Sequence, residues 1–246
     1  MALEDYKTAL VTGASSGIGA AVVRALSTRG VKVHAAARRA ERLEALAAET
    51  GCAPVVLDLR DTRALYDRLG GLEVDILINN AGLGRGFGAL FTVAPEDIDA
   101  TLQTNVLAAV HVVRATLPGM VERKRGHIVN VGSIAGLYPI KSSLYGASKG
   151  AVHLLSQDLR VELQGSGVRV TEICPGRVET EFFEVAVGAA AAKEAYAGFE
   201  VLVAGDVADA ILYALDTPWR VNIGRIELTP TEQYVGGVTI APVSGD

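Results

Sequence analysis

Short apolar runs alternate with longer amphipathic stretches along most of this chain. The runs have the length and β-branched content of strands, whereas the stretches between them repeat apolar positions with a helical period. We predict strands near residues 7–12, 31–37, 53–58, 74–79, 127–132, 168–174 and 224–229, and helices that begin near Gly17, Arg39, Asp61, Pro95, Ser143 and Asp206. This alternation predicts an α/β fold of repeated βαβ units, in which a parallel sheet is covered by helices on both faces.

The alternation is not interrupted by a linker rich in Pro, Gly or Ser. A chain of 246 residues, half of them hydrophobic, has enough apolar material for one large core. We therefore predict that residues 1–246 form a single doubly wound domain of about seven strands. Residues 180–204 are additional to the repeats and rich in Ala, Phe and Val, and we expect them to form a lid over a substrate site.

The turn after the first strand reads "VTGASSGIG", with the strand ending at Thr12 and a helix beginning near Gly17. Glycines at this turn leave space for close approach of a ligand and permit backbone conformations that other residues avoid. The free N–H groups of the following helix carry a partial positive charge that suits a pyrophosphate. Gly13, Gly17 and Gly19 therefore predict a dinucleotide site, although a tight turn with packing glycines gives the same pattern.

The second predicted strand ends "VHAAARRAERL", where a dinucleotide-binding fold meets the adenosine ribose. An acidic residue there would accept a hydrogen bond from the ribose 2′-hydroxyl and select NAD, but this chain has Ala37 followed by Arg38 and Arg39. A guanidinium can hold a 2′-phosphate through paired, charge-assisted hydrogen bonds. The sequence thus favours NADP(H), with solvated arginines at a helix start as the alternative.

Chemistry-bearing side chains gather in the second half of the chain. Tyr145 and Lys149 are four residues apart in a helical pattern, so their side chains lie on one face. An ammonium near a phenol favours the phenolate and lowers the pKa of the phenol, as a general acid/base requires. Ser133 ends the preceding strand at the carboxyl edge of the sheet, where it could donate to a substrate carbonyl.

Six motifs together resemble the short-chain dehydrogenase/reductase family: "TGASSGIG", "NNAG" at 79–82, Asn105, "GSIAG" from 132, "YGASK" from 145 and "PGRVET" from 175. The resemblance covers essentially the full length, in family order. It implies a Rossmann-like oxidoreductase with a catalytic tetrad of Asn105, Ser133, Tyr145 and Lys149. The tyrosine transfers the proton, the serine orients the carbonyl, the lysine also holds the nicotinamide ribose, and the asparagine completes a proton relay through water.

The same resemblance implies the cofactor contacts. They are Gly13, Ser15, Gly17, Ile18 and Gly19 at the phosphate turn, Arg38 and Arg39 at the 2′-phosphate, Asp58 at the adenine, Asn80, Ala81 and Gly82 beside the adenosine ribose, Tyr145 and Lys149, and Pro175, Gly176, Val178 and Thr180 around the nicotinamide. The chain departs from many family members in having one residue fewer between Ser133 and Tyr145. This shortening puts the shape of the substrate pocket in doubt rather than the chemistry.

The substrate side of the site combines apolar residues with few cations. The apolar candidates are Ile134, Leu137, Ile140, Leu144, Phe182, Phe183 and Val185, which predict a small or medium carbonyl compound with an apolar body unless they are ordinary core under the lid. Arg85, Lys141 and Arg177 are the candidates for pairing with a substrate carboxylate, Arg177 first. The stretch "VNIGRIELTPTEQ" is similar to family members that oxidise serine and related 3-hydroxy acids. A 3-oxoacyl-carrier-protein reductase and a catalytically silent NADP(H)-sensing regulator stay open as alternatives.

Charge, cysteine and histidine usage restrict the partners further. The 23 basic and 28 acidic residues are interspersed, so we expect neither nucleic acid nor an anionic membrane as a partner. Cys52 and Cys174 stand in apolar contexts and are expected to be buried and unpaired, in a cytoplasmic protein. The four histidines, His34, His111, His127 and His153, lack metal-ligand spacing, so no metal is expected.

The helical stretches from Pro95 to Glu122 and from Ser143 to Gln164 carry more apolar surface than one sheet face needs. Members of the family commonly pair these helices between subunits. We therefore expect a homodimer or homotetramer.

Overall fold

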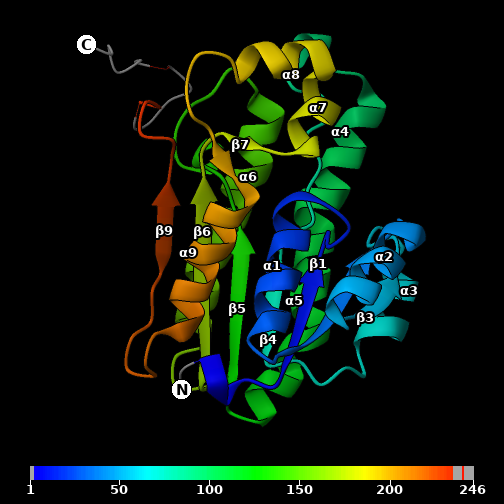
Figure 1. Cartoon of the computed structure of the whole chain (residues 1–246), viewed down its shortest axis with the longest axis vertical. Coiled ribbons are helices and arrows are strands. Elements are labelled where there is room, and N and C mark those ends of the chain that lie inside the picture. Colours follow the sequence, from blue (N-terminus) through cyan, green and yellow to red (C-terminus); the bar gives the residue numbers. More distant parts are fainter. Residues whose placement is uncertain (1–2, 235–239, 241–246) are drawn as a thin grey trace.

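The computed structural model describes residues 3–234 and 240, and its centre is a seven-stranded parallel sheet (Figure 1). The strands are β1 (Thr8–Thr12), β2 (Lys32–Ala37), β3 (Ala53–Val56), β4 (Ile76–Asn79), β5 (Gly126–Val131), β6 (Val168–Pro175) and β9 (Arg225–Leu228). Their order across the sheet is β3-β2-β1-β4-β5-β6-β9, and every neighbouring pair is parallel. The predicted fold class is confirmed, because this is a doubly wound sheet in which the strand order reverses between β1 and β4.

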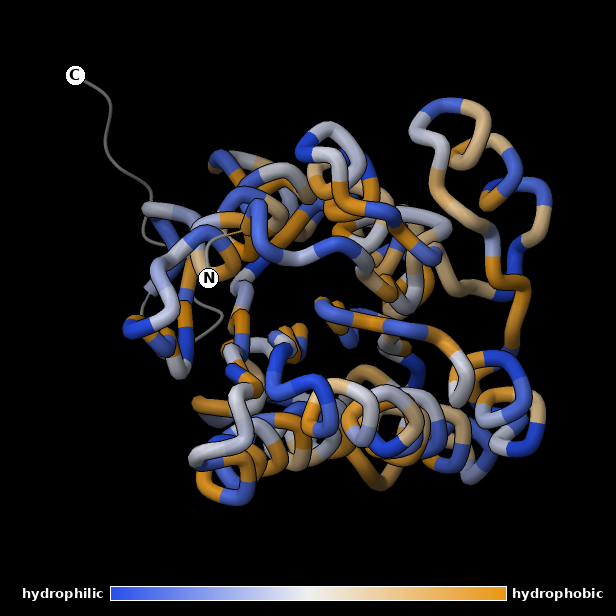
Figure 2. Tube along the Cα trace, turned by 90° about the horizontal axis from the view of Figure 1, so that it is seen from below, coloured by the Kyte–Doolittle hydropathy of each residue, from blue (hydrophilic) through white to orange (hydrophobic). Residues whose placement is uncertain are grey.

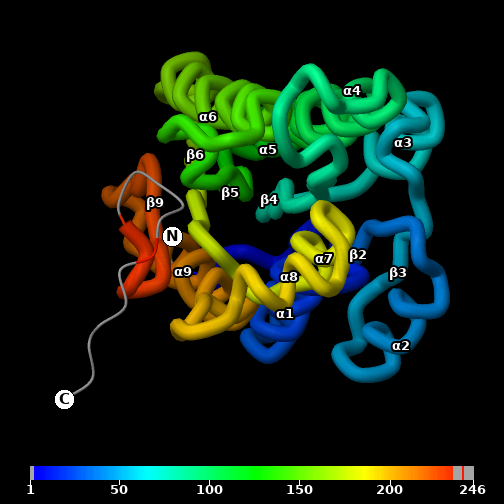
Figure 3. The backbone as a smooth tube through the Cα atoms, turned by 90° about the horizontal axis from the view of Figure 1, so that it is seen from above, coloured from blue at the N-terminus to red at the C-terminus, as the bar shows by residue number. Residues whose placement is uncertain are grey.

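Helices form a layer on each face of the sheet (Figure 3). Their bounds are α1 (Gly17–Thr28), α2 (Ala40–Thr50), α3 (Thr62–Leu69), α4 (Pro95–Leu102), α5 (Ala108–Glu122), α6 (Ser143–Glu162), α7 (Glu181–Val187), α8 (Ala189–Ala195) and α9 (Ala204–Asp216). Apolar side chains of α1, α2 and α9 pack on one face, and those of α3, α5 and α6 pack on the other. None of the helices in the described part of the chain has the length and apolar character needed to cross a membrane.

Strand geometry divides the apolar residues between these two cores. In β1, Ala9 and Val11 join the core beneath α1 and α9, whereas Leu10 between them joins the core beneath α5. Ile76 and Leu77 of β4 divide in the same way, because successive side chains of a strand point to opposite faces. Figure 2 shows both helical layers with the sheet between them and apolar and polar residues alternating along each layer. The nearly continuous apolar sequence of the strands therefore follows from burial on both sides.

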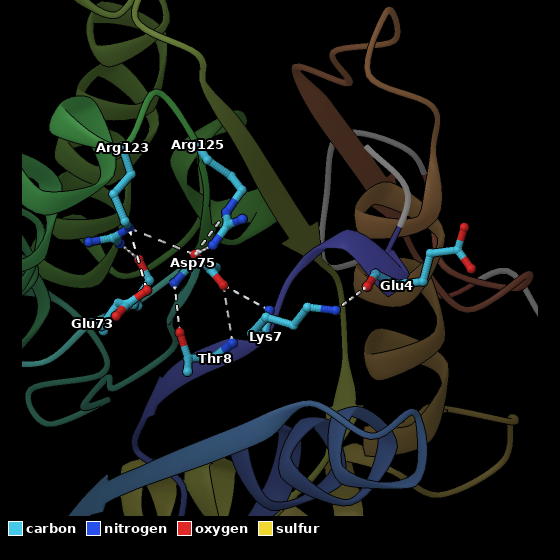
Figure 4. A network of polar contacts seen from close by, with 8 residues as sticks. Glu4, Lys7, Thr8, Glu73, Asp75, Arg123 and Arg125 are labelled. Carbon is cyan, nitrogen blue, oxygen red and sulfur yellow. Dashed lines mark hydrogen bonds and ion pairs between the residues drawn. The ribbon is translucent and has the colours of Figure 1, made fainter.

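A buried aspartate closes the amino edge of the sheet (Figure 4). Asp75, which is fully buried, accepts a hydrogen bond of 2.7 Å from the backbone N–H of Lys7 and one of 3.0 Å from the guanidinium of Arg125. The guanidinium of Arg123 donates to the carbonyl oxygen of Val74 and lies within 4.0 Å of Asp75. Two of the three cations in the Arg123–Arg125 cluster are thus occupied by groups of the protein itself.

The predicted elements agree closely with the structure, and the exceptions are local. The last large helix begins at Ala204 rather than near Asp206, because the Asp206 carboxylate accepts from the Val203 N–H and caps the first turn from within the helix. The predicted long helix from Pro95 is divided by a π-helical turn at Gln103–Leu107. Residues 180–204 contain α7, α8 and β8 (Leu202–Val203), which pairs with β7 (Val178–Glu179).

Candidate active site

A cleft of about 590 Å³ opens at the carboxyl edge of the sheet, the end toward which the strand arrows point in Figure 1. Residues that follow β1, β2, β4, β5 and β6 line it, so it lies where the strand order reverses. Open α/β sheets bind their ligands at this position. Seen from above, α7 lies over the sheet between the two helical layers (Figure 3), and Glu181, Phe182, Phe183 and Val185 of this helix line the cleft.

The glycines of the first turn make room for the protein's own backbone as well as for a ligand. Gly13 has a φ of +66°, and a Cβ atom there would lie 2.9 Å from the Cα of Ala81. Gly17 has a φ of +51° and faces Thr180, the residue before α7, whereas a Cβ on Gly19 would collide with the carbonyl oxygen of Gly13. Only Gly13 and Gly17 of the three line the cleft. Gly19 therefore lies behind the cleft lining, where its lack of a side chain lets α1 pack close to the turn.

The "NNAG" segment ties the ends of β1 and β4 together. The side-chain amide of Asn80 donates to the carbonyl oxygen of Thr12 at 2.9 Å, and the Ala81 N–H donates to the Thr12 hydroxyl at 3.0 Å. Asn80, Ala81 and Gly82 all line the cleft. The segment thus fixes the floor of the predicted adenosine region, in addition to the ribose contact that the resemblance implies.

The arginines predicted at the 2′-phosphate lie at one end of the cleft, and Arg39 is extensively hydrogen-bonded. Its Nε donates to the Ser15 hydroxyl at 3.0 Å, its Nη2 to the Ser16 hydroxyl at 2.6 Å and its Nη1 to the carboxylate of Glu181 at 2.9 Å. Arg42 binds the same carboxylate at 2.6 Å. Glu181, the first residue of α7, therefore joins the phosphate end of the cleft to the segment above it.

Arg38 differs from Arg39 in having no hydrogen bond or ion pair with the residues that the structure describes. Its charge nevertheless acts on Asp58, whose pKa is lowered chiefly by a hydrogen bond from Arg60 and to a smaller extent by Arg38. Arg38, Arg39 and Arg42 against Glu181 leave two positive charges at this end. That excess matches the charge of a phosphate monoester at neutral pH, about −1.5 to −2.

Ser133, Tyr145 and Lys149 meet at the other end of the cleft. Tyr145 and Lys149 stand one turn apart on α6, and each is more than nine-tenths buried. The ammonium of Lys149 donates to the carbonyl oxygen of Val131 at 2.9 Å and lies 6.0 Å from the centroid of the Tyr145 ring. The Ser133 side chain hydrogen-bonds with the Tyr145 phenol, and its hydroxyl oxygen accepts from the Ala135 N–H at 3.1 Å.

Burial dominates the electrostatics of this pair. It raises the pKa of Tyr145 to about 12, against a smaller lowering effect of the Ser133 hydrogen bond. It also lowers the pKa of Lys149 to about 8. The sequence-based expectation that the ammonium lowers the pKa of the phenol is therefore not met in this arrangement, because the phenol is desolvated and the ammonium is directed to the Val131 carbonyl.

Asn105 lies behind this end of the cleft, in the π-helical turn between α4 and α5. Its side chain accepts from the Leu83 N–H at 2.7 Å and donates to the Leu83 carbonyl at 2.9 Å and the Ser148 hydroxyl at 3.0 Å. Its Oδ1 and the Lys149 Nζ both lie within 4 Å of the position that a Cβ on Gly82 would occupy. A π-helical turn is a local insertion that often marks a functional position. Here it places the Asn105 side chain and the Lys149 ammonium on the same side of Gly82.

Aromatic rings surround the Tyr145 phenol. Its centroid lies 5.1 Å from that of Phe87 and 5.6 Å from that of Phe182, and Phe183 packs edge-on against Phe87. The sequence predicts Phe182 and Phe183 at this site but not Phe87. The rings explain why the phenol is so strongly desolvated, and they give the cleft an apolar wall beside the predicted proton donor.

The three candidate cations for a substrate carboxylate have different surroundings. Arg177 lines the cleft, but its guanidinium donates to the Ala195 carbonyl oxygen at 2.6 Å and stacks over Phe199 at 5.5 Å. Lys141 lines the cleft as an exposed residue and has no hydrogen bond or ion pair with the described residues. Arg85 lies outside the lining, near Asp97. Lys141 thus replaces Arg177 as the strongest of the three.

Of the predicted catalytic and cofactor-binding residues all but two line the cleft, whereas the predicted substrate-side residues Leu137, Leu144 and Arg85 lie outside its lining. Gly19 and Asn105 support the cleft from behind, and the others line it: Gly13, Ser15, Gly17, Ile18, Arg38, Arg39, Asp58, Asn80, Ala81, Gly82, Ser133, Tyr145, Lys149, Pro175, Gly176, Val178 and Thr180. Sequence reasoning missed Ser16, Arg60, Phe87, Glu181 and Gln233 of the lining. The acidic Glu181 at the start of this segment, opposite the predicted arginines of the phosphate end, was a usable signal. The approach of Gln233 to the cleft could not be predicted, because the stretch "VNIGRIELTPTEQ" that it ends gives no sign of contact with Arg177, 56 positions earlier.

Two of the four histidines and both cysteines lie among packed side chains outside the cleft. His127 is fully buried beside Thr171, His111 contacts Tyr66, and Cys52 and Cys174 are buried free thiols. Across the described ranges, no three His, Cys, Asp or Glu side chains are grouped in a way that could hold a metal ion.

Comparison with known proteins assigns the chain and its fold to one family. The short chain dehydrogenase model matches residues 7–205. The chain is 42% identical to an uncharacterized short-chain type dehydrogenase/reductase, y4eK, of Sinorhizobium fredii over 98% of both chains. It is 39% identical to the NADP-dependent 3-hydroxy acid dehydrogenase YdfG of Escherichia coli K12, covering 94% of this chain and 98% of that protein. The closed form of serine dehydrogenase complexed with NADP+ superposes with a TM-score of 0.90 and 38% identity, covering 96% of this chain and 100% of the other. The chain belongs to the short-chain dehydrogenase/reductase family of oxidoreductases.

Proposed function

We propose that this protein is an NADP(H)-dependent oxidoreductase that moves a hydride between the nicotinamide and the carbon of a carbonyl or secondary alcohol group. The observation that carries the proposal is the meeting of Ser133, Tyr145 and Lys149 at one end of a dinucleotide-sized cleft, with Arg38 and Arg39 at the other. Bound NADP(H) supplies the hydride chemistry. The protein binds and orients the cofactor and the substrate, and it exchanges the proton with the substrate oxygen.

In the reductive direction Tyr145 donates its phenolic proton to the developing alkoxide, and Ser133 donates a hydrogen bond to the same oxygen. A pKa of about 12 keeps the Tyr145 phenol protonated throughout the physiological range, so the acid form is available for reduction. The reverse reaction needs the phenolate. Its fraction rises about tenfold per pH unit below the pKa, so alcohol oxidation should accelerate from pH 6 toward pH 8 and then level off as Lys149 loses its proton, while reduction does not accelerate.

Lys149 and Asn105 support this proton transfer. Lys149 would hold the nicotinamide ribose, and its ammonium already lies beside the phenol ring. Asn105, fixed by Leu83 and Ser148, would carry the relay onward through water. Asn105 is 2% exposed and outside the lining of the cleft, which suits a group that acts behind the reacting atoms.

We propose 3-hydroxy acids and the corresponding 3-oxo acids as the substrate class. The relatives named for 3-hydroxy acids and serine align over nearly the whole chain and support this choice. Lys141 provides a cation on the cleft wall for the carboxylate, and Phe87 and Phe182 provide an apolar wall for the rest of the substrate. A small neutral ketone with an apolar body is the second candidate, favoured by the same aromatic wall.

Two other functions have less support. A carrier-protein substrate would need an accessible basic surface near the cleft, but the Arg123–Arg125 cluster lies at the opposite edge of the sheet, where Asp75 binds two of its cations. A silent NADP(H) sensor would have no need of a complete set of Ser133, Tyr145, Lys149 and Asn105.

Replacement of Tyr145 by Phe tests the proposal. We expect NADPH-dependent reduction of 3-oxo acids to fall by roughly 10² to 10⁴, typical of a lost general acid, while NADPH binding measured by fluorescence stays within about threefold. Tyr138→Phe is the matched control, because this tyrosine binds Glu227 away from the reacting atoms. Normal turnover by Tyr145→Phe would remove the phenol from the mechanism, and inactivity of the wild type toward every carbonyl tested would favour the sensor.

We further propose that residues 180–204 act as a lid and that the protein is a symmetric homodimer or homotetramer. The contacts of Glu181 with Arg39 and of Arg177 with Ala195 support the lid, since they connect it to both ends of the cleft. Exposed Leu107, at the end of the π-helical turn before α5, and exposed Leu154 of α6 support the oligomer.

A further inference from the structure

A buried carboxylate that the proposed mechanism does not use lies against the turn that binds its lysine. Glu172 belongs to β6, the strand beside β5, and is 1% exposed. One carboxylate oxygen receives a 2.6 Å contact from the Nδ1 of His153. The other lies against Gly132, where any Cβ atom would collide with it. Gly132, the first glycine of "GSIAG", is therefore required by Glu172, and it also lines the cleft.

The Glu172 carboxylate lies between α6, which carries Lys149, and the turn after β5, which carries Ser133. His153 stands one turn after Lys149 on α6, so both side chains lie on the helix face that covers β5 and β6. Gly132 stands between Val131, whose carbonyl accepts from the Lys149 ammonium, and Ser133. Glu172 thus supports the turn that holds the lysine and the serine.

Two other groups near Glu172 could supply a negative charge to Lys149, and neither does. Lys149 and His153 face Glu172 from α6 and Cys174 from β6, while Arg225 and Glu227 lie on the neighbouring β9. Burial raises the pKa of Cys174 far above its usual range, so this thiol is neutral at working pH. Glu227 accepts a hydrogen bond from Tyr138 at 3.1 Å and is not among the charges that act on Lys149.

We propose that Glu172 is a positioning residue for the reaction: a buried carboxylate, anchored by His153, that holds the Lys149 ammonium in its charged form and supports the Val131–Ser133 turn. The need for such a group is physical, since removal of an ammonium from water favours its neutral form unless an anion lies nearby. Burial lowers the pKa of Lys149, and Cys174 and then Glu172 oppose that lowering. Because the Cys174 thiol is neutral at working pH, the carboxylate of Glu172 is the anion that can act there. The inference rests on the role proposed for Lys149.

Glu172→Gln removes the charge and keeps the shape, so it is the direct test. With Glu172 present, the kcat/KM of NADPH-dependent reduction should decline above about pH 8, where Lys149 loses its proton. Without the anion the charged lysine is less stable, so this decline should move to lower pH by about one unit, a tenfold change in the protonation constant. Activity at pH 6 should then stay within about threefold of the wild type.

Matched variants separate this role from a structural one. Glu172→Asp keeps the charge and should keep the wild-type profile, and Glu227→Gln removes an equal charge one strand away and should not shift it. If Glu172→Gln does not fold, the double variant Glu172→Gln/His153→Gln replaces the pair by two amides that can hydrogen-bond to each other and should show the same shift. Circular dichroism and thermal melting establish that each variant is folded.

The outcomes are distinguishable. A uniform loss of activity at every pH, or an unshifted decline in a folded Glu172→Gln variant, would overturn the role of Glu172. Lys149→Ala, measured alongside, tests the proposed function separately. If Lys149→Ala is inactive and Glu172→Gln keeps the wild-type profile, only the inference about Glu172 is wrong. If Lys149→Ala stays active, the proposed mechanism itself is wrong.

Discussion

Arg38 offers the sharpest test of how the cofactor is chosen. It stands at the end of β2, lines the cleft and has no hydrogen bond or ion pair with described residues, so its guanidinium is available to a 2′-phosphate. Arg39, in contrast, has already committed three N–H groups to Ser15, Ser16 and Glu181. We therefore predict that Arg38 contributes more than Arg39 to the discrimination between NADPH and NADH.

The size of the effect follows from the contact that is lost. A hydrogen bond to a charged group contributes about 1.5–3 kcal/mol, and each 1.4 kcal/mol is a tenfold change in affinity. Because Arg38 is exposed, solvent screening places the effect in the lower part of that range. Arg38→Ala should lower kcat/KM for NADPH roughly 10- to 30-fold and change that for NADH less than about threefold.

Steady-state kinetics with both cofactors and one saturating carbonyl substrate measures this ratio. Arg63→Ala is the control, because Arg63 is an almost fully exposed arginine on α3, outside the cleft. Raising the ionic strength should reduce the wild-type preference for NADPH and leave that of Arg38→Ala nearly unchanged, since exposed charges are screened by salt. Equal losses with NADPH and NADH, or no loss with either, would refute the assignment of Arg38 to the 2′-phosphate.

Three further predictions concern the lid, the assembly and the phosphate turn. Glu181→Gln removes two exposed ion pairs and should raise the KM for substrate about two- to fivefold; the neighbouring Glu184→Gln should not, and equal values for the two variants would contradict the lid contact. Leu154→Glu places a charge on a 57% exposed apolar side chain of α6 and should reduce an oligomer to the 25.7 kDa monomer in light scattering, whereas a monomeric wild type would disprove the interface. Gly19→Ala should destabilise the fold by about 1–3 kcal/mol and lower the Tm by roughly 3–10 °C because its Cβ meets the Gly13 carbonyl. Gly71→Ala, which meets nothing within 4 Å, should melt like the wild type, and an unchanged melting temperature for Gly19→Ala would show that the turn can relax.

The order and type of the elements can be predicted from the amino-acid sequence. Strand runs such as that containing Ala9, Leu10 and Val11 are apolar at every position because both faces of the sheet are covered, and this pattern is visible without coordinates. Short motifs determined most of the cleft for a related reason. In a parallel sheet the carboxyl ends of all strands meet at one edge, so residues placed just after each strand converge there.

Contacts between segments that are distant in the chain depend on how the elements pack together. Glu181 and Arg39 are 142 positions apart, and Glu172 and His153 belong to different elements, so neither pairing has a local signature. The insertion of a π-helical turn at Asn105 also depends on packing against α6, because the isolated sequence is equally compatible with a regular helix.

The protonation behaviour of the site was likewise beyond the sequence. The spacing of Tyr145 and Lys149 predicted that they share a helix face, and they do. It could not predict that Phe87 and Phe182 desolvate the phenol or that the Val131 carbonyl receives the ammonium. A pKa depends on how much water and which charges surround a group, and those are set only when separate elements pack together.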